Sequence, residues 1–99
     1  MTYFAVGREH GPAWDESRGM REQEDWDAHA AFMDALAERG FIVLGGPLAD
    51  TDKVLLIVDA ASAAEVEASF ADDPWTPMGV LRITSIEPWE ILLRGPEPA

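Results

Sequence analysis

The sequence predicts an α+β fold in which four strands form one antiparallel sheet and two helices cover one of its faces. Short β-prone apolar runs and two helical stretches follow one another in the order βαββαβ. The chain has 99 residues, which is enough for one domain and too few for two. It contains no cysteine, which excludes disulfides, thiolate catalysis and Cys-bound metal centres.

The first half of the chain is expected to form a strand, a helix and a second strand. The β-prone residues 3–6 end at Gly7, and loops follow at 10–12 and 15–19. A helix is expected from Arg21, with acidic side chains near its start and Gly40 after its end. Its apolar stripe is Trp26, Ala30, Met33 and Ala37, flanked by His29, Phe32 and Leu36. The second strand, residues 41–44, is stopped by the Gly-Gly-Pro of 45–47.

The second half is expected to form a strand, a helix and a last strand. Residues 53–59 carry a continuous apolar run, which indicates burial on both faces or on one face plus a partner subunit. Ser62 and Glu65 form a capping box, and the helix ends near Ala71 because Pro74 disfavours helix at the preceding residue. The last strand covers 79–85, and residues 86–93 are a candidate extension past a proline break, as an edge segment or a swapped arm. The domain therefore covers 1–94, and 95–99 is a frayed tail.

The order βαββαβ is that of the ferredoxin-like split βαβ fold, with both helices on one face of the sheet. The other face needs a cover, and a second copy of the chain is the commonest one. Packing of two sheets in a dimeric α+β barrel would explain the apolar third strand and the apolar residues 91–93. A homodimer, or a larger assembly built from it, is therefore the expected state.

The charge of the chain restricts its partners. Seven Lys and Arg against 19 Asp and Glu give a net charge of −12. Nucleic acid and anionic membranes are therefore not expected, because both require clustered basic side chains. The N-terminal residues do not resemble a signal peptide, and no apolar run approaches the roughly 18 residues of a membrane helix. A cytoplasmic protein is expected.

No cofactor is expected. The Gly-Gly-Pro of 45–47 lacks the spacing and the lysine of a phosphate-binding loop, and is more typical of a bulge or a close backbone approach. His10, His29 and a carboxylate could form a metal site by number alone. However, no pair of histidines has the close spacing of metal ligands, so metal is not expected.

Two histidines are candidates for chemistry. His10 follows the first strand, where it is either an exposed loop residue or a group at the mouth of a pocket. His29 flanks the apolar stripe of the helix, so its ring points toward the sheet. It is either a structural histidine satisfied by a carbonyl or carboxylate, or a catalytic base whose tautomer is fixed by a carboxylate.

The turn Asp72-Asp73-Pro74-Trp75 supplies candidate partners. Two carboxylates at the end of a helix are unfavourable for its dipole, which suggests a compensating cation, and a protonated histidine is one possibility. The alternative is that both acids are simply solvated in a turn. Trp14 and Trp75 fall in expected loops, where an aromatic side chain can line a pocket for a flat ligand.

Several stretches together resemble the YCII-related (YciI-like) family of small ferredoxin-like dimers, from Tyr3 to Leu93. They are the helix segment WDAHAAF at 26–32, Gly40, GGPL at 45–48, DDPW at 72–75, Gly79, and IEPW at 86–89. The resemblance implies an active-site pair of a helix histidine and the aspartate of the Asp-Pro turn, which here are His29 and Asp73. Asp72 lies one residue too early. The longer loop 11–20 departs from the shortest members and puts the shape of the pocket in question.

The family resemblance and the residues together favour a cofactor-free enzyme. The expected chemistry is lyase, dehydrochlorinase-like or isomerase-like proton transfer on a small aromatic or enolic molecule, because one member is a dehydrochlorinase of a chlorinated hydroxyhydroquinone. His29 would be the acid or base, Asp73 would orient it, and His10, Trp14 and Trp75 would contact the substrate. The alternative is a non-catalytic ligand-binding or accessory dimer. A third reading, an acidic mimic of nucleic acid, has little support because the acids are spread evenly.

Overall fold

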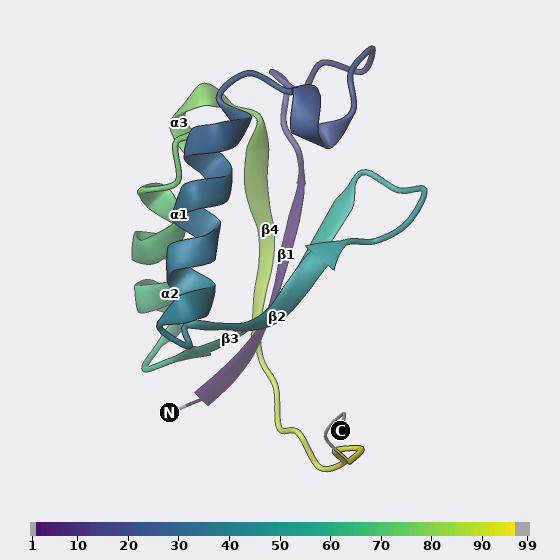
Figure 1. The fold of residues 1–99 in the computed structure, drawn as a ribbon. Coiled ribbons are helices and arrows are strands. Elements are labelled where there is room, and N and C mark those ends of the chain that lie inside the picture. The colour runs from purple at the N-terminus through teal and green to yellow at the C-terminus, as the bar shows by residue number, and fades with distance from the viewer. Residues whose placement is uncertain (1, 97–99) are drawn as a thin grey trace.

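The computed structural model describes residues 2–96 and has one four-stranded antiparallel sheet with α1, α2 and α3 on one face (Figure 1). The strands are ordered β2-β3-β1-β4 in the sheet. The elements are β1 (Thr2–His10), η1 (Met20–Glu22), α1 (Trp26–Glu38), β2 (Ile42–Pro47), β3 (Lys53–Ala60), α2 (Ala63–Ala71), α3 (Trp75–Met78) and β4 (Leu81–Pro88). The expected α+β, ferredoxin-like fold class is confirmed. Within residues 2–96, no helix has the length and apolar character needed to cross a membrane.

The central strand β1 is longer than expected. It continues through Gly7 to His10 and pairs with β3 on one side and β4 on the other. A Cβ on Gly7 would lie 2.6 Å from the Ser85 hydroxyl, so the glycine allows close approach of β4, and the register with β4 shifts directly after it. Because side chains alternate along a strand, Arg8 faces the same side as the buried Val6.

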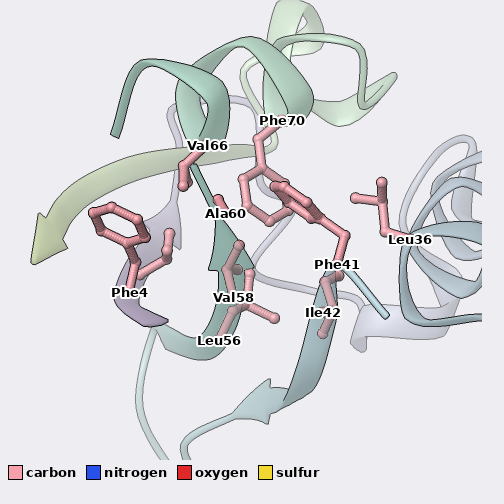
Figure 2. Close-up of a cluster of buried hydrophobic side chains, with 10 residues drawn as sticks. Phe4, Leu36, Phe41, Ile42, Leu56, Val58, Ala60, Val66 and Phe70 are labelled. Atoms are coloured by element: carbon pink, nitrogen blue, oxygen red, sulfur yellow. The ribbon is translucent and has the colours of Figure 1, made fainter. Parts of the chain in front are cut away.

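The main core lies between the sheet and the helices (Figure 2). Val6 of β1 and Val58 of β3 pack against Val66 and Phe70 of α2 in this core. All four side chains are fully buried. Phe41 lies edge-on to Phe70, with ring centroids 6.1 Å apart. Each such side chain stabilises the fold by about 1.5–3 kcal/mol relative to an exposed one. A second cluster of Trp75, Val80 and Leu81 lies beside α3.

The start and the buried face of α1 differ from expectation. Residues 20–22 form one 3-10 turn, and α1 begins only at Trp26 because Asp25 adopts a left-handed conformation with φ of 59°. The buried face is centred on His29 and Leu36, so the expected stripe is rotated and Ala37 is exposed. Gly40, with φ of 80°, follows the helix as predicted.

Other boundaries show where single residues set the local geometry. The Ser62 hydroxyl caps α2 at the Glu65 N–H, 3.1 Å away, as predicted, while the Glu65 carboxylate accepts from Ala61 N–H. β2 does not stop at the glycines but runs to Pro47. The pairing register of β2 with β3 shifts between Ile42 and Leu44 and not at the glycines. The two strands nevertheless approach closely at Gly45, where a Cβ would clash with Leu56.

The C-terminal strand ends earlier than its apolar sequence suggested. β4 includes residues 86–88 and ends at Pro88, which lacks an N–H for the ladder. Trp89 N–H still donates to the Tyr3 carbonyl at 2.8 Å, but residues 91–93 are not in a strand. Of the expected tail, residues 97–99 lie outside the described part of the chain.

The short helix α3 was not expected, and a glycine contact fixes its position. Gly11 N–H donates to the Val80 carbonyl at 2.8 Å and Ala13 N–H donates to the Gly79 carbonyl at 2.9 Å. A Cβ on Gly11 would lie 2.2 Å from that Gly79 oxygen. The loop after β1 can therefore reach the end of α3 only with glycine at position 11.

We predict that Gly11→Ala lowers the free energy of unfolding by about 1–3 kcal/mol, because the methyl group forces two backbone segments apart. Chemical denaturation measures the loss. Gly46→Ala is the matched control, since its Cβ would meet nothing within 4 Å. It should stay within about 0.5 kcal/mol of the wild type. Equal stability of the two variants would contradict the prediction.

Candidate active site

Asp73 is a fully buried carboxylate in the turn between α2 and α3. Its Oδ1 accepts from the Trp75 backbone N–H at 2.9 Å, so the turn itself fixes the carboxylate plane. Arg8 Nη1 donates to its Oδ2 at 2.8 Å. His29 Nδ1 lies 2.9 Å from each oxygen. The carboxylate thus joins β1, α1 and the α2–α3 turn.

The surroundings of Asp73 favour its ionised form. Burial is the largest single influence and raises the pKa of this carboxyl. The hydrogen bonds from His29, Arg8 and the Trp75 N–H act in the opposite direction, as does the electrostatic attraction of His29, and together they outweigh burial. The pKa of Asp73 is therefore lowered from its ordinary value of 3.8.

His29 is held by its carboxylate partner and by stacked aromatic rings. Since an ionised carboxylate only accepts hydrogen bonds, Nδ1 carries the proton in the neutral imidazole and Nε2 carries the lone pair. The ring stacks on Trp75 with centroids 3.8 Å apart and planes 8° apart. Trp75 is fixed in turn, because its indole N–H donates to the Glu24 carbonyl at 2.7 Å. Among the described residues, Nε2 has no hydrogen-bond partner.

Arg8 is a site residue that the sequence analysis missed. It is fully buried, and besides Asp73 it donates to the Thr76 hydroxyl at 3.1 Å, while its guanidinium lies 5.3 Å from the Phe70 ring centroid. Its Nε is buried with no partner among the described residues. The alternating positions of Phe4, Val6 and Arg8 could have indicated that Arg8 faces the core. The predicted strand, however, ended at Gly7 and left Arg8 out.

The exposed edge of His29 borders a cavity of about 230 Å³, called here the His29 cavity. Its walls come from β1, η1, α1, both strands of the β2–β3 hairpin and β4: Arg8, Met20, Trp26, His29, Met33, Gly45, Gly46, Pro47, Val54, Leu56 and Leu81. Most of these side chains are apolar. Asp73 is not among them and lies behind the histidine. The imidazole is therefore the group that can exchange a proton with a ligand in this cavity.

The three predicted substrate contacts lie at a second cavity of about 250 Å³, called here the His10 cavity. It is lined by His10, Trp14, Met20, Pro47, Leu48, Ala49, Asp50, Thr51, Val54, Trp75 and Leu81. His10 ends β1 and stacks on Trp14 with centroids 3.6 Å apart. Trp75 is fully buried in α3, not in a loop as expected, and it supports the wall without an exposed surface. None of these three residues lines the His29 cavity.

The arrangement suits proton transfer. The His29 cavity holds one imidazole with a free nitrogen, set in mostly apolar walls that also include Arg8, and the buried Asp73 carboxylate is not part of these walls. Within residues 2–96, no three His, Asp or Glu side chains are grouped so that they could hold a metal ion.

We predict that the stabilisation from Asp73 is lost in acid. Its pKa is lower in the folded chain than in the unfolded chain, so the stabilisation is complete above about pH 4 and disappears as the pH falls through the folded value. The unfolding free energies of the wild type and Asp73→Asn should therefore differ most at neutral pH and converge below pH 4. Asp72→Asn, a change of the exposed neighbouring carboxylate, is the control. A difference from wild type that is independent of pH would contradict the prediction.

Comparisons with known proteins place this chain in a family. The family model of the YCII-related domain matches residues 1–90. Among solved structures, the chain is similar to the 5-chloro-2-hydroxyhydroquinone dehydrochlorinase from Burkholderia phenoliruptrix, solved in complex with 2,5-dihydroxybenzoquinone. The identity is 28% and the TM-score 0.67, with 89% of this chain and 93% of that chain covered. A search of curated proteins found no match. With nine-tenths of its length matched, the chain belongs to the YCII-related domain family.

Proposed function

We propose that the chain is a small enzyme of the YCII type that transfers a proton on a hydroxylated aromatic or enolic molecule. His29 is the acid and base, and Asp73 is the positioning residue. One observation carries the proposal: His29 Nδ1 lies 2.9 Å from the Asp73 carboxylate while the same ring borders an apolar cavity. A non-catalytic module has no need of an imidazole nitrogen left free at a cavity, so this placement favours the enzyme.

The solved neighbour supports the chemical class. That protein is a dehydrochlorinase of a chlorinated hydroxyhydroquinone, and its ligand is a dihydroxybenzoquinone. Both are flat six-membered rings with ionisable hydroxyl groups. The apolar walls of the His29 cavity suit such a ring, and His29 is the group able to take a hydroxyl proton.

The proposed reaction starts with a proton shift from oxygen to carbon. His29 Nε2 takes a proton from a ring hydroxyl, and the O–H electron pair becomes the C=O bond of a keto form. The imidazolium returns that proton to a ring carbon, which completes an isomerisation. Where this carbon carries chlorine, Nε2 then takes a second hydroxyl proton while the C–Cl bond breaks and chloride leaves with the bonding pair. The net loss is HCl, and the product is a quinone.

The buried groups around His29 favour this cycle. Asp73 stabilises the imidazolium that forms after each proton abstraction, and its contact with Nδ1 leaves Nε2 as the nitrogen that exchanges a proton. Arg8 balances the charge of Asp73 whenever the imidazole is neutral. The aromatic stack with Trp75 fixes the ring plane. A base held in this way contributes about 10²–10⁴-fold to the rate.

We predict that His29→Gln lowers kcat for 5-chloro-2-hydroxyhydroquinone by about 10²–10⁴-fold, because the amide cannot carry the proton. Chloride release measures turnover. His10→Gln and Asp72→Asn should change neither constant for this single-ring substrate, because neither residue lines the His29 cavity. Unchanged kcat in a folded His29→Gln variant would contradict the assignment of the base.

We also propose that the chain is a homodimer joined through the helix-free face of its sheet. That face and the segment after β4 expose Val43, Leu44, Leu55, Trp89, Leu92 and Leu93. Leu44 is 64% exposed and Leu93 91% exposed. A hollow of about 590 Å³ lies among several of them and is lined also by Ile57 of β3. An apolar surface of this extent is typical of an interface, and a second copy offers the same self-complementary surface.

The dimer proposal predicts that a charge on this face separates the subunits. Leu44→Asp combined with Leu93→Glu should sediment as a monomer under conditions in which the wild type is a dimer, because buried unpaired carboxylates are costly. Leu48→Asp, which removes an exposed leucine outside this face, should remain a dimer. A monomeric wild type in sedimentation equilibrium would refute the proposal.

A further inference from the structure

The His29 cavity and the His10 cavity adjoin each other. Four residues line both: Met20, Pro47, Val54 and Leu81. We infer that they form one site with two compartments, in which the His29 cavity holds the reacting ring and the His10 cavity holds an uncharged, apolar substituent about one further ring in size. The inference rests on the proposed function, because it specifies what the proposed substrate carries.

The volumes favour a ligand that occupies both compartments. The His29 cavity measures about 230 Å³ and the His10 cavity about 250 Å³. Each is smaller than the roughly 300–1,000 Å³ of typical small-molecule sites, whereas the two together fall within that range. A single hydroxylated ring engaged with His29 leaves the second compartment to solvent.

The His10 cavity has walls suited to a flat apolar group. The stacked rings of His10 and Trp14 form one side. Leu48 and Ala49, at the turn of the β2–β3 hairpin, form another. Aromatic and aliphatic side chains in this arrangement contact a second ring through dispersion and burial rather than through directed hydrogen bonds.

Hydrogen bonds fix these walls before a ligand binds. On the aromatic side, Trp14 N–H donates to the Gly11 carbonyl at 3.1 Å, and Trp14 lies edge-on to Trp75 at 6.1 Å. On the hairpin side, the Thr51 hydroxyl donates to the Leu48 carbonyl at 2.9 Å, and Leu48 N–H donates to the Lys53 carbonyl at the same distance. A preformed compartment loses little entropy on binding.

The charge around the His10 cavity selects against anions. Asp50 is among its lining residues, whereas no lysine or arginine is. The chain as a whole carries −12. Asp50 would repel a carboxylate or phosphate on the substituent, which would lose hydration with no lysine or arginine in the walls to pair with it. An apolar group meets no such penalty.

Two quinones that differ by one ring test the inference by calorimetric titration, which requires no turnover. The wild type should bind 2,5-dihydroxy-3-phenylbenzoquinone about tenfold or more tightly than 2,5-dihydroxybenzoquinone, because the phenyl ring leaves water. The 3-(4-carboxyphenyl) analogue should lose that gain. Equal affinity for the first two quinones, or tightest binding of the carboxyphenyl analogue, would overturn the inference.

A variant that fills the His10 cavity tests whether the phenyl substituent binds there. Ala49→Trp places an indole in the His10 cavity, and it should abolish the preference for the phenyl ligand while leaving the affinity for 2,5-dihydroxybenzoquinone unchanged. Ala31→Trp, on the exposed face of α1, is the matched control and should keep the preference. A preference retained in Ala49→Trp would overturn the placement of the substituent.

The outcomes separate this inference from the proposed function. If 2,5-dihydroxybenzoquinone binds, His29→Gln removes turnover and the phenyl group adds nothing, only the second compartment is refuted. If neither quinone binds the wild type, the ligand class of the proposed function is refuted, and the inference is refuted with it.

Discussion

The Asp73 carboxylate is the point on which the site depends. It receives hydrogen bonds from Arg8 of β1 and from the Trp75 backbone, and its contact with His29 reaches α1. It therefore ties together three elements that are far apart in the sequence. A buried anion is stable only when its hydrogen-bonding capacity is filled, so these partners must be in place together. The position of His29 follows from that requirement and does not depend on loop geometry alone.

The ion pair of Arg8 and Asp73 does not by itself show that these two residues stabilise the fold. Removing Arg8 and Asp73 from water costs several kcal/mol per ion, which their attraction only partly offsets. An apolar pair of similar volume would fill the same space without leaving Arg8 Nε unpaired. A chemical role for the carboxylate would explain why two charged side chains occupy a position that apolar side chains could fill. In the proposed function, the imidazole of His29 at a cavity, in contact with that carboxylate, gives it such a role.

The sequence predicted the fold well because the fold depends on patterns that are local. Strand runs, the Ser62 cap and Gly40 each act within a few residues, and their order sets the topology. The four-residue helix α3 escaped notice because it contains a proline and offers too few residues to show a period. The late start of α1 depends on the left-handed Asp25, which no apolar pattern reveals. The contact between His29 and Asp73 came from the family resemblance, since 44 residues separate the two.

The structure shows where one of the few basic side chains of this acidic chain lies. Acidic side chains outnumber basic ones by 19 to 7, yet the cation Arg8 is fully buried and paired with Asp73. With His29 neutral, the buried group formed by Arg8, Asp73 and His29 carries no net charge. When His29 takes a proton in the proposed reaction, the group carries one positive charge, next to the place where a substrate oxygen would become negative. Under the proposed function, this positive charge arises only during the reaction, in largely apolar walls where its attraction for an enolate is strong.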